Sequence, residues 1–412
     1  MSAKYVQPQN NGCRVDKLRA DVILRKILQQ GRNAFKRPDR YANAIIFPNL
    51  ALMLACRQIS LTQFRNYIFE QFSFNKNITG IYGRNGSGKT NLLDAIYYLC
   101  FTKSSFNRPD NQSVKDGYAG FRIEAKFIKD EEEKKLVCIL RENNRKEFSV
   151  DDEMYQRFSE HIGKFPCVMI APDDVSLITE GSEERRKFVD TLLSQLQHDY
   201  LEQLIAYNKI LQQRNSFLKF AAERNSYDES LLEILNTQLL EKGNFVYERR
   251  LKFLKEFLPQ VLQQYISIAN NDDKLILEYE SQLNHISFEE LLEQNLQRDL
   301  YLQRTGCGIH KDDITIELQQ SNFRNIASQG QRKSLLFAFK LAAFEILKEN
   351  KGFSPVLLLD DVFEKLDEQR MQNLLQYVCV QSGAQVFITD THKERLQQAF
   401  MKIGKDYDLI EL

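Results

Sequence analysis

The 412-residue sequence has no excess of charge of either sign, since 56 lysines and arginines balance 56 aspartates and glutamates. The field of the whole protein therefore neither indicates nor excludes a polyanionic partner, and any nucleic-acid surface must be a local patch. Seven cysteines are scattered without a C-x-x-C pair, which argues against a zinc site or a disulfide framework and suits a reducing compartment. The five histidines are equally dispersed, with no metal-ligand spacing.

Long apolar runs are also missing. None approaches the roughly 18 residues that a membrane-spanning helix needs, so we expect no membrane association. A hydrophobic content of 43% and a charged content of 27% are ordinary for a globular protein. A chain of this length is expected to form two or three domains with ample material for a core.

The first 52 residues differ from the rest of the sequence. They carry ten lysines and arginines against three aspartates, a net charge of +7, which leaves −7 for the remaining 360 residues. This segment could be a basic arm that contacts nucleic acid, a targeting sequence, or upstream sequence ahead of a true start at Met53. In each case we expect residues 1–52 to be a poorly ordered extension.

Residues 79–93 read TGIYGRNGSGKTNLL and contain G-x-x-x-x-G-K-T, the pattern of a phosphate-binding loop. Its glycines allow backbone turns that a Cβ would forbid, so that successive N–H groups can point at an anion. Lys89 supplies a mobile charge for the β- and γ-phosphates, and the Thr90 hydroxyl can ligate Mg²⁺. The residues predicted to bind nucleotide are Gly83, Arg84, Asn85, Gly86, Ser87, Gly88, Lys89 and Thr90.

The sequence around this loop supplies the strand and the helix that such a site requires. NITGIYG before it is a short apolar run, and NLLDAIYYLCF after it repeats apolar residues at helical spacing. The N-terminus of that helix adds its dipole to the anion site. We therefore predict that the chain binds a nucleoside triphosphate.

The rest of the sequence alternates between strand-rich and helix-rich blocks. In residues 53–182, runs of alternating apolar and polar residues indicate antiparallel strands on either side of the phosphate loop. In residues 183–300, apolar residues at spacings of three and four indicate amphipathic helices, and Pro259 is expected to interrupt the second of them. Residues 301–412 return to alternating strands and helices. We expect residues 53–182 and 301–412 to be the N-terminal and C-terminal lobes of one head, and residues 183–300 to be an inserted helical domain.

Two motifs in the last block extend the prediction to an ATPase site. VLLLDD is an apolar run that ends in two acids; Asp360 could hold the Mg²⁺ shared with Thr90, and Asp361 could orient the attacking water. SQGQRK opens a helix, and its Ser328 and Gly330 could meet a phosphate through a hydroxyl and a backbone N–H. Ser328 is equally suited to be an ordinary helix N-cap.

Together with KLD at 365–367, the order of these motifs resembles an ABC-type ATPase head that is split by a helical insertion. The resemblance implies an α/β fold with a P-loop α/β core, an antiparallel β lobe and a helical insertion domain. An SMC-type protein would need long coiled coils, and the helical block is too short for them.

Among such heads the sequence resembles the RecF family of bacterial DNA replication and repair proteins. The resemblance extends from about Met53 nearly to the end of the chain, so only the first 52 residues lie outside it. The segments that carry it are LTQFRNY (61–67), GRNGSGKTNLLDAIYYL (83–99), APDDVSLITEGSEERRKFVD (171–190), GIHKDDI (308–314), SQGQRKSLLFAFKLA (328–342) and LLLDDVFEKLD (357–367).

The resemblance implies a cytoplasmic, ATP-dependent DNA-binding protein of the SOS-linked repair machinery. Such proteins act at single-strand gaps and help to load the recombinase together with other recombination mediator proteins. ATP would drive formation of a homodimer, in which Ser328 and Gly330 of one subunit contact the γ-phosphate held by the other. Lys89 and Asp361 would be the catalytic residues, with Asp361 positioning water. The implied Mg²⁺ ligands are Thr90 and Asp360.

Two features of the sequence leave alternatives open. Asp361 stands where most ABC ATPases have Glu, which suggests slow turnover and leaves a nucleotide-bound scaffold protein, or another SMC-like ATPase head, as the alternative. His392 could be a switch histidine or an ordinary surface residue.

No aromatic-interleaved basic strip is present, so sequence-specific readout of DNA is not expected. The basic residues considered for DNA phosphate contacts are Lys103, Arg108, Arg185, Arg186 and Lys187.

Overall fold

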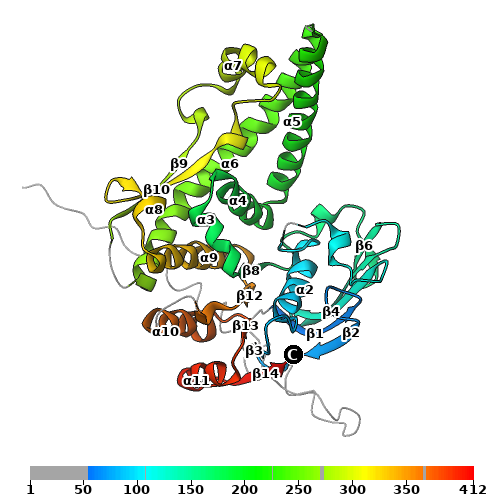
Figure 1. The fold of residues 1–412 in the computed structure, drawn as a ribbon, viewed down its shortest axis with the longest axis vertical. Coiled ribbons are helices and arrows are strands. Elements are labelled where there is room, and N and C mark those ends of the chain that lie inside the picture. Colours follow the sequence, from blue (N-terminus) through cyan, green and yellow to red (C-terminus); the bar gives the residue numbers. More distant parts are fainter. Residues whose placement is uncertain (1–53, 107, 225, 270–272, 365–367) are drawn as a thin grey trace, which may run out of the picture. The chain divides into compact units, whose positions relative to one another are not determined.

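The computed structural model describes residues 54–412 except for 107, 225, 270–272 and 365–367 (Figure 1). The predictions made above for residues 1–52 and for the KLD motif at 365–367 therefore lie outside the described residues.

A five-stranded parallel sheet carries the phosphate loop. Its strand order is β14-β3-β13-β12-β8, and every neighbouring pair is parallel. All residues of β12 are buried, which explains why this strand reads as a continuous apolar run. Because the strands are parallel, the carboxyl ends of β3, β13 and β12 meet at one edge. The strands are β3 (Ile78–Tyr82), β8 (Cys167–Ile170), β12 (Val356–Leu359), β13 (Val386–Asp390) and β14 (Tyr407–Glu411).

A six-stranded antiparallel sheet covers the other side of the helix that follows the phosphate loop, α2 (Lys89–Phe101). Ten of the thirteen residues of α2 are buried, because residues of both sheets pack against it in one apolar cluster. The sheet has the order β2-β1-β4-β5-β6-β7. Its strands are β1 (Ala55–Thr62), β2 (Phe69–Ser73), β4 (Phe121–Lys129), β5 (Glu132–Leu140), β6 (Lys146–Val150) and β7 (Glu153–Met154).

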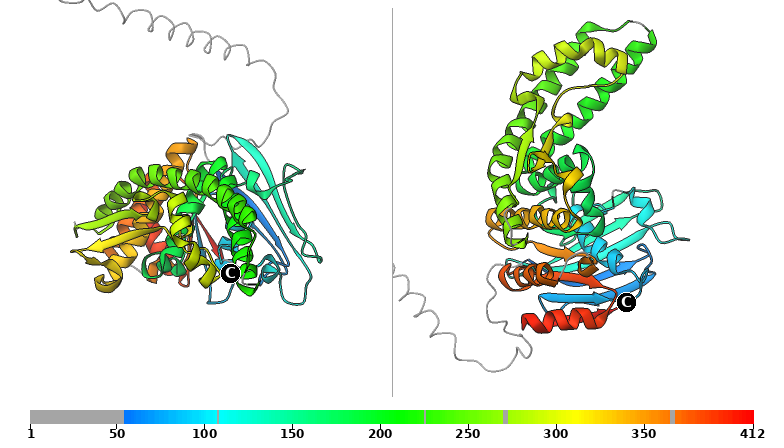
Figure 2. Two further views of the ribbon diagram at one scale, coloured as in Figure 1. Left: turned by 90° about the horizontal axis from the view of Figure 1, so that it is seen from above. Right: turned by 60° about the vertical axis from the view of Figure 1, so that its left-hand side comes forward.

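A helical domain is inserted between β8 and β12. Its two longest helices, α5 and α6, lie side by side and extend away from the sheets (Figure 2). A small antiparallel sheet of order β11-β10-β9 lies beside α6. Among the described residues, no helix is both long enough and apolar enough to cross a lipid bilayer. The main elements are α4 (Ser182–Leu196), α5 (His198–Arg224), α6 (Glu229–Ala269), β9 (Leu275–Glu280), α7 (Phe288–Leu302), β10 (Asp313–Leu318) and β11 (Ser321–Asn322).

Helix α9 (Gln329–Lys351), which begins at the SQGQ motif, lies between α6 and the parallel sheet (Figure 1). The remaining helices are α3 (Ser176–Thr179), α8 (Phe323–Ile326), α10 (Glu368–Gln376) and α11 (Lys393–Ile403). Single turns are η1 (Asp110–Ser113), η2 (Phe158–Glu160), η3 (Pro172–Val175), η4 (Gln282–Asn284), η5 (Ile309–Lys311), η6 (Val362–Glu364) and η7 (Tyr377–Gln381).

The predicted fold class, an α/β core with an antiparallel β lobe and a helical insertion, is confirmed. The domain boundaries at 182/183 and 300/301 stay predictions. The expected break at Pro259 is wrong, because α6 continues through it. Phe257, Leu258 and Val261 around this proline are buried in the core, and their burial outweighs the backbone hydrogen bond that proline cannot donate.

Ion pairs connect helices α4 and α6 to each other and to the GIHKDDI segment (308–314). The guanidinium of Arg250 on α6 donates to Asp190 on α4 at 2.9 Å and to Asp312 at 2.8 Å. Arg185 on α4 donates to both carboxylate oxygens of Asp313 at 2.6 and 3.0 Å. Helix α4 and the GIHKDDI segment thus both have a structural role in the inserted domain.

We expect Arg250→Met to lower the free energy of unfolding by about 3 kcal/mol, because it leaves two acids without their buried cation. Arg249→Met is the matched control. Its side chain is 39% exposed, against 3% for Arg250, so loss of its pair with Asp199 should cost less than about 1 kcal/mol. Urea denaturation followed by circular dichroism measures both free energies of unfolding. Equal losses of stability in the two variants would contradict a stabilising role for the buried ion pairs of Arg250.

A second stability prediction concerns pH. His161 is fully buried, and its Nε2 donates to the carbonyl of Leu99 at 2.7 Å. Burial lowers the pKa of the His161 imidazole from 6.5 to about 4, so the folded protein keeps it neutral while the unfolded chain protonates it. Stability should therefore fall as the pH drops from about 6.5 towards 4, by on the order of 3 kcal/mol from this residue.

His161→Gln removes this proton uptake, so its free energy of unfolding should change less between about pH 7 and pH 4.5 than that of the unmodified protein. Denaturant titrations at the two pH values give the comparison. His285→Gln, at an exposed position, should keep the full pH dependence. If His161→Gln also kept it, the buried neutral state of His161 would be contradicted.

Candidate nucleotide-binding site

The phosphate loop connects β3 to α2. Gly88 has a φ of 116°, and a Cβ there would lie 2.6 Å from the side-chain amide nitrogen of Asn66, so only glycine fits. The Nζ of Lys89 folds back over the loop and donates to the carbonyls of Gly83 at 2.8 Å and Arg84 at 3.1 Å. The lysine is 7% exposed, and its charge is therefore concentrated at the loop.

The second half of the site lies where β12 ends. Thr90, at the start of α2, donates its hydroxyl to Asp360 Oδ2 at 2.8 Å. Thr389 on β13 donates to the other oxygen, Oδ1, at 2.7 Å. Burial raises the pKa of the Asp360 carboxyl above its ordinary value, and the hydrogen bonds from Thr389 and Thr90 oppose that shift. Thr90 and Asp360 are 270 positions apart in the sequence, and the structure brings them together as predicted.

Asp361 has an unusual backbone. Its φ is 49°, a left-handed conformation that is uncommon for a residue other than glycine and that often marks a functional constraint. Its N–H donates to the Thr389 hydroxyl at 2.8 Å. Its carboxylate oxygen Oδ1 is buried and has no hydrogen-bond partner in the described part of the chain. This oxygen is therefore available to accept a hydrogen bond from a water or a ligand.

The residues present fit a nucleotide with Mg²⁺. The loop presents a lysine charge and the buried Ser87 hydroxyl, whose oxygen is without a partner among residues 54–412 as described. The Thr90–Asp360 pair offers a hydroxyl and a carboxylate, and Mg²⁺ prefers such oxygen ligands together with phosphates. An open pocket of about 750 Å³ lies over the loop, and its wall includes His392, which leaves both interpretations of that histidine open.

The FRNY segment braces the outer side of the loop, a role that the sequence analysis did not assign. The amide of Asn66 donates to the Ser87 carbonyl at 2.9 Å, and the Tyr67 hydroxyl donates to the Gly88 carbonyl at 2.9 Å. Arg65 is anchored in turn, because its guanidinium pairs with the buried carboxylate of Asp94 on α2 at 3.1 Å. The only signal for this brace in the sequence was the presence of FRNY among the segments that resemble the family.

Ser328 forms the helix cap that the sequence left open as the simpler alternative. Its hydroxyl accepts from the Gln331 N–H at 3.2 Å, and the Gln331 side chain accepts from the Ser328 N–H at 2.9 Å, a capping box. Within the described ranges, neither Ser328 nor Gly330 lines the pocket over the phosphate loop of the same chain. Their contact with the γ-phosphate of a second subunit stays a prediction.

The predicted DNA contact of Arg185 is wrong. The residue is 9% exposed, and its guanidinium is occupied by Asp313 and by the carbonyls of Leu177 and Glu180. Arg186 donates to the backbone carbonyl of Asp312 at 2.6 Å. Both arginines of α4 therefore bind residues 312 and 313 within the inserted domain.

The three other basic residues differ in how far they are neutralised. Lys187 forms ion pairs with Glu183 and Glu184 at 2.9 and 2.8 Å. Lys103 and Arg108, in the segment after α2, are exposed and form no ion pair with any residue that the structure describes. These two remain the predicted contacts with DNA phosphates.

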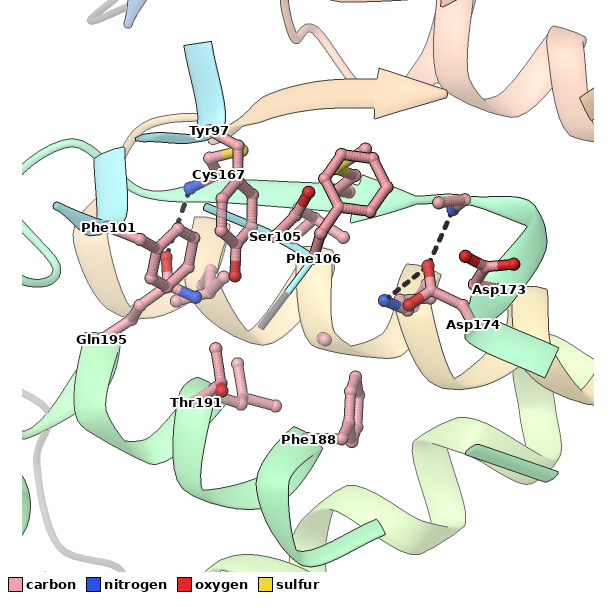
Figure 3. Close-up of a pocket in the computed structure, with 17 residues that line it drawn as sticks. Tyr97, Phe101, Ser105, Phe106, Cys167, Asp173, Asp174, Phe188, Thr191 and Gln195 are labelled. Carbon is pink, nitrogen blue, oxygen red and sulfur yellow. Dashed lines mark hydrogen bonds and ion pairs between the residues drawn. The ribbon is translucent and has the colours of Figure 1, made fainter. Parts of the chain in front are cut away.

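A second cavity, of about 140 Å³, lies between α2, β8, α4 and α9 (Figure 3). Its aromatic walls include Tyr97 and Phe101 of α2, whose rings stack at 4.3 Å, and Phe188 of α4. An ion pair of 2.9 Å between Lys340 on α9 and Asp174 lies at its edge. No residue of the phosphate loop lines this cavity, which lies where α2 and α9 approach each other.

Comparisons with known proteins agree with this arrangement. The family model of the RecF/RecN/SMC N terminal domain matches residues 55–407. The DNA replication and repair protein RecF of Flavobacterium johnsoniae is 41% identical over 355 residues, which cover 86% of this chain and 99% of that protein. RecF of Cytophaga hutchinsonii is 39% identical over 351 residues, covering 85% and 93%.

A solved structure is similar over the same range. The structure of the recombination mediator protein RecF-ATP in the RecFOR pathway has a TM-score of 0.77 and 31% identity, and the match covers 84% of this chain and 95% of that one. The phosphate loop, the acids after β12 and these relatives all point to one conclusion. The chain belongs to the RecF family of DNA replication and repair proteins.

Proposed function

We propose that this protein is a slow, DNA-stimulated ATPase in which ATP drives homodimerisation and binding of single-stranded or gapped DNA. The observation that carries the proposal is the hydrogen bond between Thr90 and Asp360, which joins the phosphate loop to a buried carboxylate. Family membership supports a role in replication and repair. Support for ATP comes from the solved RecF-ATP structure at 31% identity.

The setting of this activity is proposed on the same basis. The RecFOR pathway named for the solved relative supports recombination mediator proteins as partners. Recombinase loading, the SOS response and a cytoplasmic location follow from the family resemblance of the sequence.

At the site, each residue would act on the triphosphate in one way. Lys89 would exchange its two carbonyl contacts for phosphate oxygens, since its flexible chain carries three N–H donors. Thr90 and Asp360 would hold Mg²⁺, which neutralises charge on the phosphates during transfer. Asp361 would orient the attacking water through its free oxygen. Because an aspartate reaches less far than a glutamate, slow turnover is expected.

The proposed dimerisation is supported by the position of α9 relative to the pocket of its own chain. The exposed N-terminus of α9 carries backbone N–H groups and a helix dipole suited to a phosphate, but among the described residues it does not line the pocket over the same chain's loop. A second subunit could present that helix end to the nucleotide. DNA would then bind through phosphate contacts with Lys103 and Arg108, so its affinity should fall steeply with salt.

The ATPase assignment predicts different losses for two substitutions. Lys89→Met should weaken ATP binding by roughly tenfold or more, because a charge-assisted contact to phosphate is lost. Asp361→Asn should bind ATP normally but release phosphate at least roughly tenfold more slowly, because the water-orienting acceptor is weakened. Equilibrium binding of a fluorescent ATP analogue and phosphate release with gapped duplex DNA separate the two effects.

Lys209→Met, an exposed lysine on α5, is the control for this experiment and should behave as the unmodified protein. Phosphate release that is undetectable in the unmodified protein and in Asp361→Asn alike would exclude the ATPase and favour the nucleotide-bound scaffold.

The dimer is tested at the cap of α9. Ser328→Asp keeps a good N-cap acceptor but adds a negative charge where the γ-phosphate of the other subunit would lie. Sedimentation should show an ATP-dependent dimer for the unmodified protein and for Ser328→Thr, and a monomer that still binds ATP for Ser328→Asp. An ATP-dependent dimer of Ser328→Asp with unchanged stability would contradict the shared site.

A further inference from the structure

We infer that the hydroxyl of Thr389 is a positioning group that sets the direction of both acids of the site with one oxygen atom. The inference rests on the proposed function, since it assigns Thr389 a part in holding Mg²⁺ and the attacking water through Asp360 and Asp361. Thr389 is fully buried on β13, between β12 and the phosphate-loop strand β3. It therefore makes no direct contact with solvent.

The direction of its two hydrogen bonds is determined by chemistry. The Thr389 hydroxyl accepts from the backbone N–H of Asp361 at 2.8 Å, because an N–H can only donate. Its single hydrogen is then left for Asp360 Oδ1, which lies 2.7 Å away and can only accept when ionised. One hydroxyl thus serves both acids at once, and neither bond can be reversed.

The bond to Asp360 holds one of its two carboxylate oxygens. Thr389 donates to Oδ1 at 2.7 Å, and the Thr90 hydroxyl lies nearer to the other oxygen, Oδ2, at 2.8 Å than to Oδ1 at 3.1 Å. The carboxylate is therefore restrained from rotating by hydroxyls on both sides, and Thr90 and Asp360 would hold a shared Mg²⁺. Partners of this kind behind a metal ligand commonly tune how tightly the metal is held.

The bond from Asp361 holds an uncommon backbone conformation. The φ of 49° at Asp361 is disfavoured for a residue with a Cβ, and the N–H bond to Thr389 ties this residue to β13. Without that tie the residue would be free to relax towards the usual negative φ, and its carboxylate would move. Thr389 therefore also aims the unpartnered oxygen of Asp361.

The chain contains a matched control for this role. Thr79 is fully buried on the adjacent strand β3, opposite Phe387 of β13, and its hydroxyl has no hydrogen-bond partner in the part of the chain that the structure describes. Thr→Val preserves shape at both positions. Only at Thr389 does it remove hydrogen bonds to the acids.

The experiment compares Thr389→Val, Thr389→Ser and Thr79→Val in the full chain. The affinity for a fluorescent ADP analogue is measured with Mg²⁺ and with EDTA, and the rate of phosphate release is measured alongside. With Mg²⁺ present, Thr389→Val should bind the ADP analogue about tenfold more weakly than the unmodified protein and should release phosphate about tenfold more slowly. Both losses are the effect expected for one lost hydrogen bond to a charged group. The affinity of Thr389→Val in EDTA should not change, and the other two variants should stay within about twofold of the unmodified protein.

Wild-type Mg²⁺ dependence and turnover in Thr389→Val would overturn the inference and leave the proposed function standing. An equal loss in Thr79→Val would overturn it as well, because the effect would then come from packing. Absence of nucleotide binding by the unmodified protein would instead contradict the proposed function and this inference with it. Should Thr389→Val fail to fold, Thr389→Cys, whose thiol is a weak donor, gives the same comparison.

Discussion

The arrangement depends on one hydrogen bond, from the Thr90 hydroxyl to the Asp360 carboxylate, between residues 270 positions apart. It forms because β3, β13 and β12 are parallel neighbours, with Gly80, Ile388 and Leu359 level with one another. The loops after these strands therefore open at the same edge of the sheet. Parallel sheets commonly place ligand sites at the carboxyl ends of their strands. The inserted helical domain can be long without disturbing this contact.

The other layers support that edge. The antiparallel sheet buries α2, and the FRNY brace holds the carbonyls of Ser87 and Gly88 from outside the loop. In the inserted domain, Arg250 ties α6 to α4 and to the HKDD segment through buried ion pairs. Helix α9 then lies against α6, so the SQGQ motif sits at the end of a supported helix. The family relationship gives the whole assembly its setting in DNA replication and repair.

The sequence predicted the fold class and the meeting of Thr90 with Asp360, because both depend on local patterns with strict backbone requirements. It could not predict contacts that only tertiary structure creates. Asn66, Tyr67 and Thr389 have no signal in spacing or composition, and each acts through a partner distant in sequence. Arg185 was misjudged for the same reason, since an arginine on an amphipathic helix does not reveal that Asp313 will bury it.

A crystal structure with a non-hydrolysable ATP analogue and Mg²⁺ would test whether the phosphate loop and Asp360 together form the nucleotide site. We expect Lys89 to leave the carbonyls of Gly83 and Arg84 for phosphate oxygens, and the metal to lie beside the Thr90 hydroxyl and Asp360. A nucleotide bound elsewhere, with Lys89 still on those two carbonyls, would contradict this expectation.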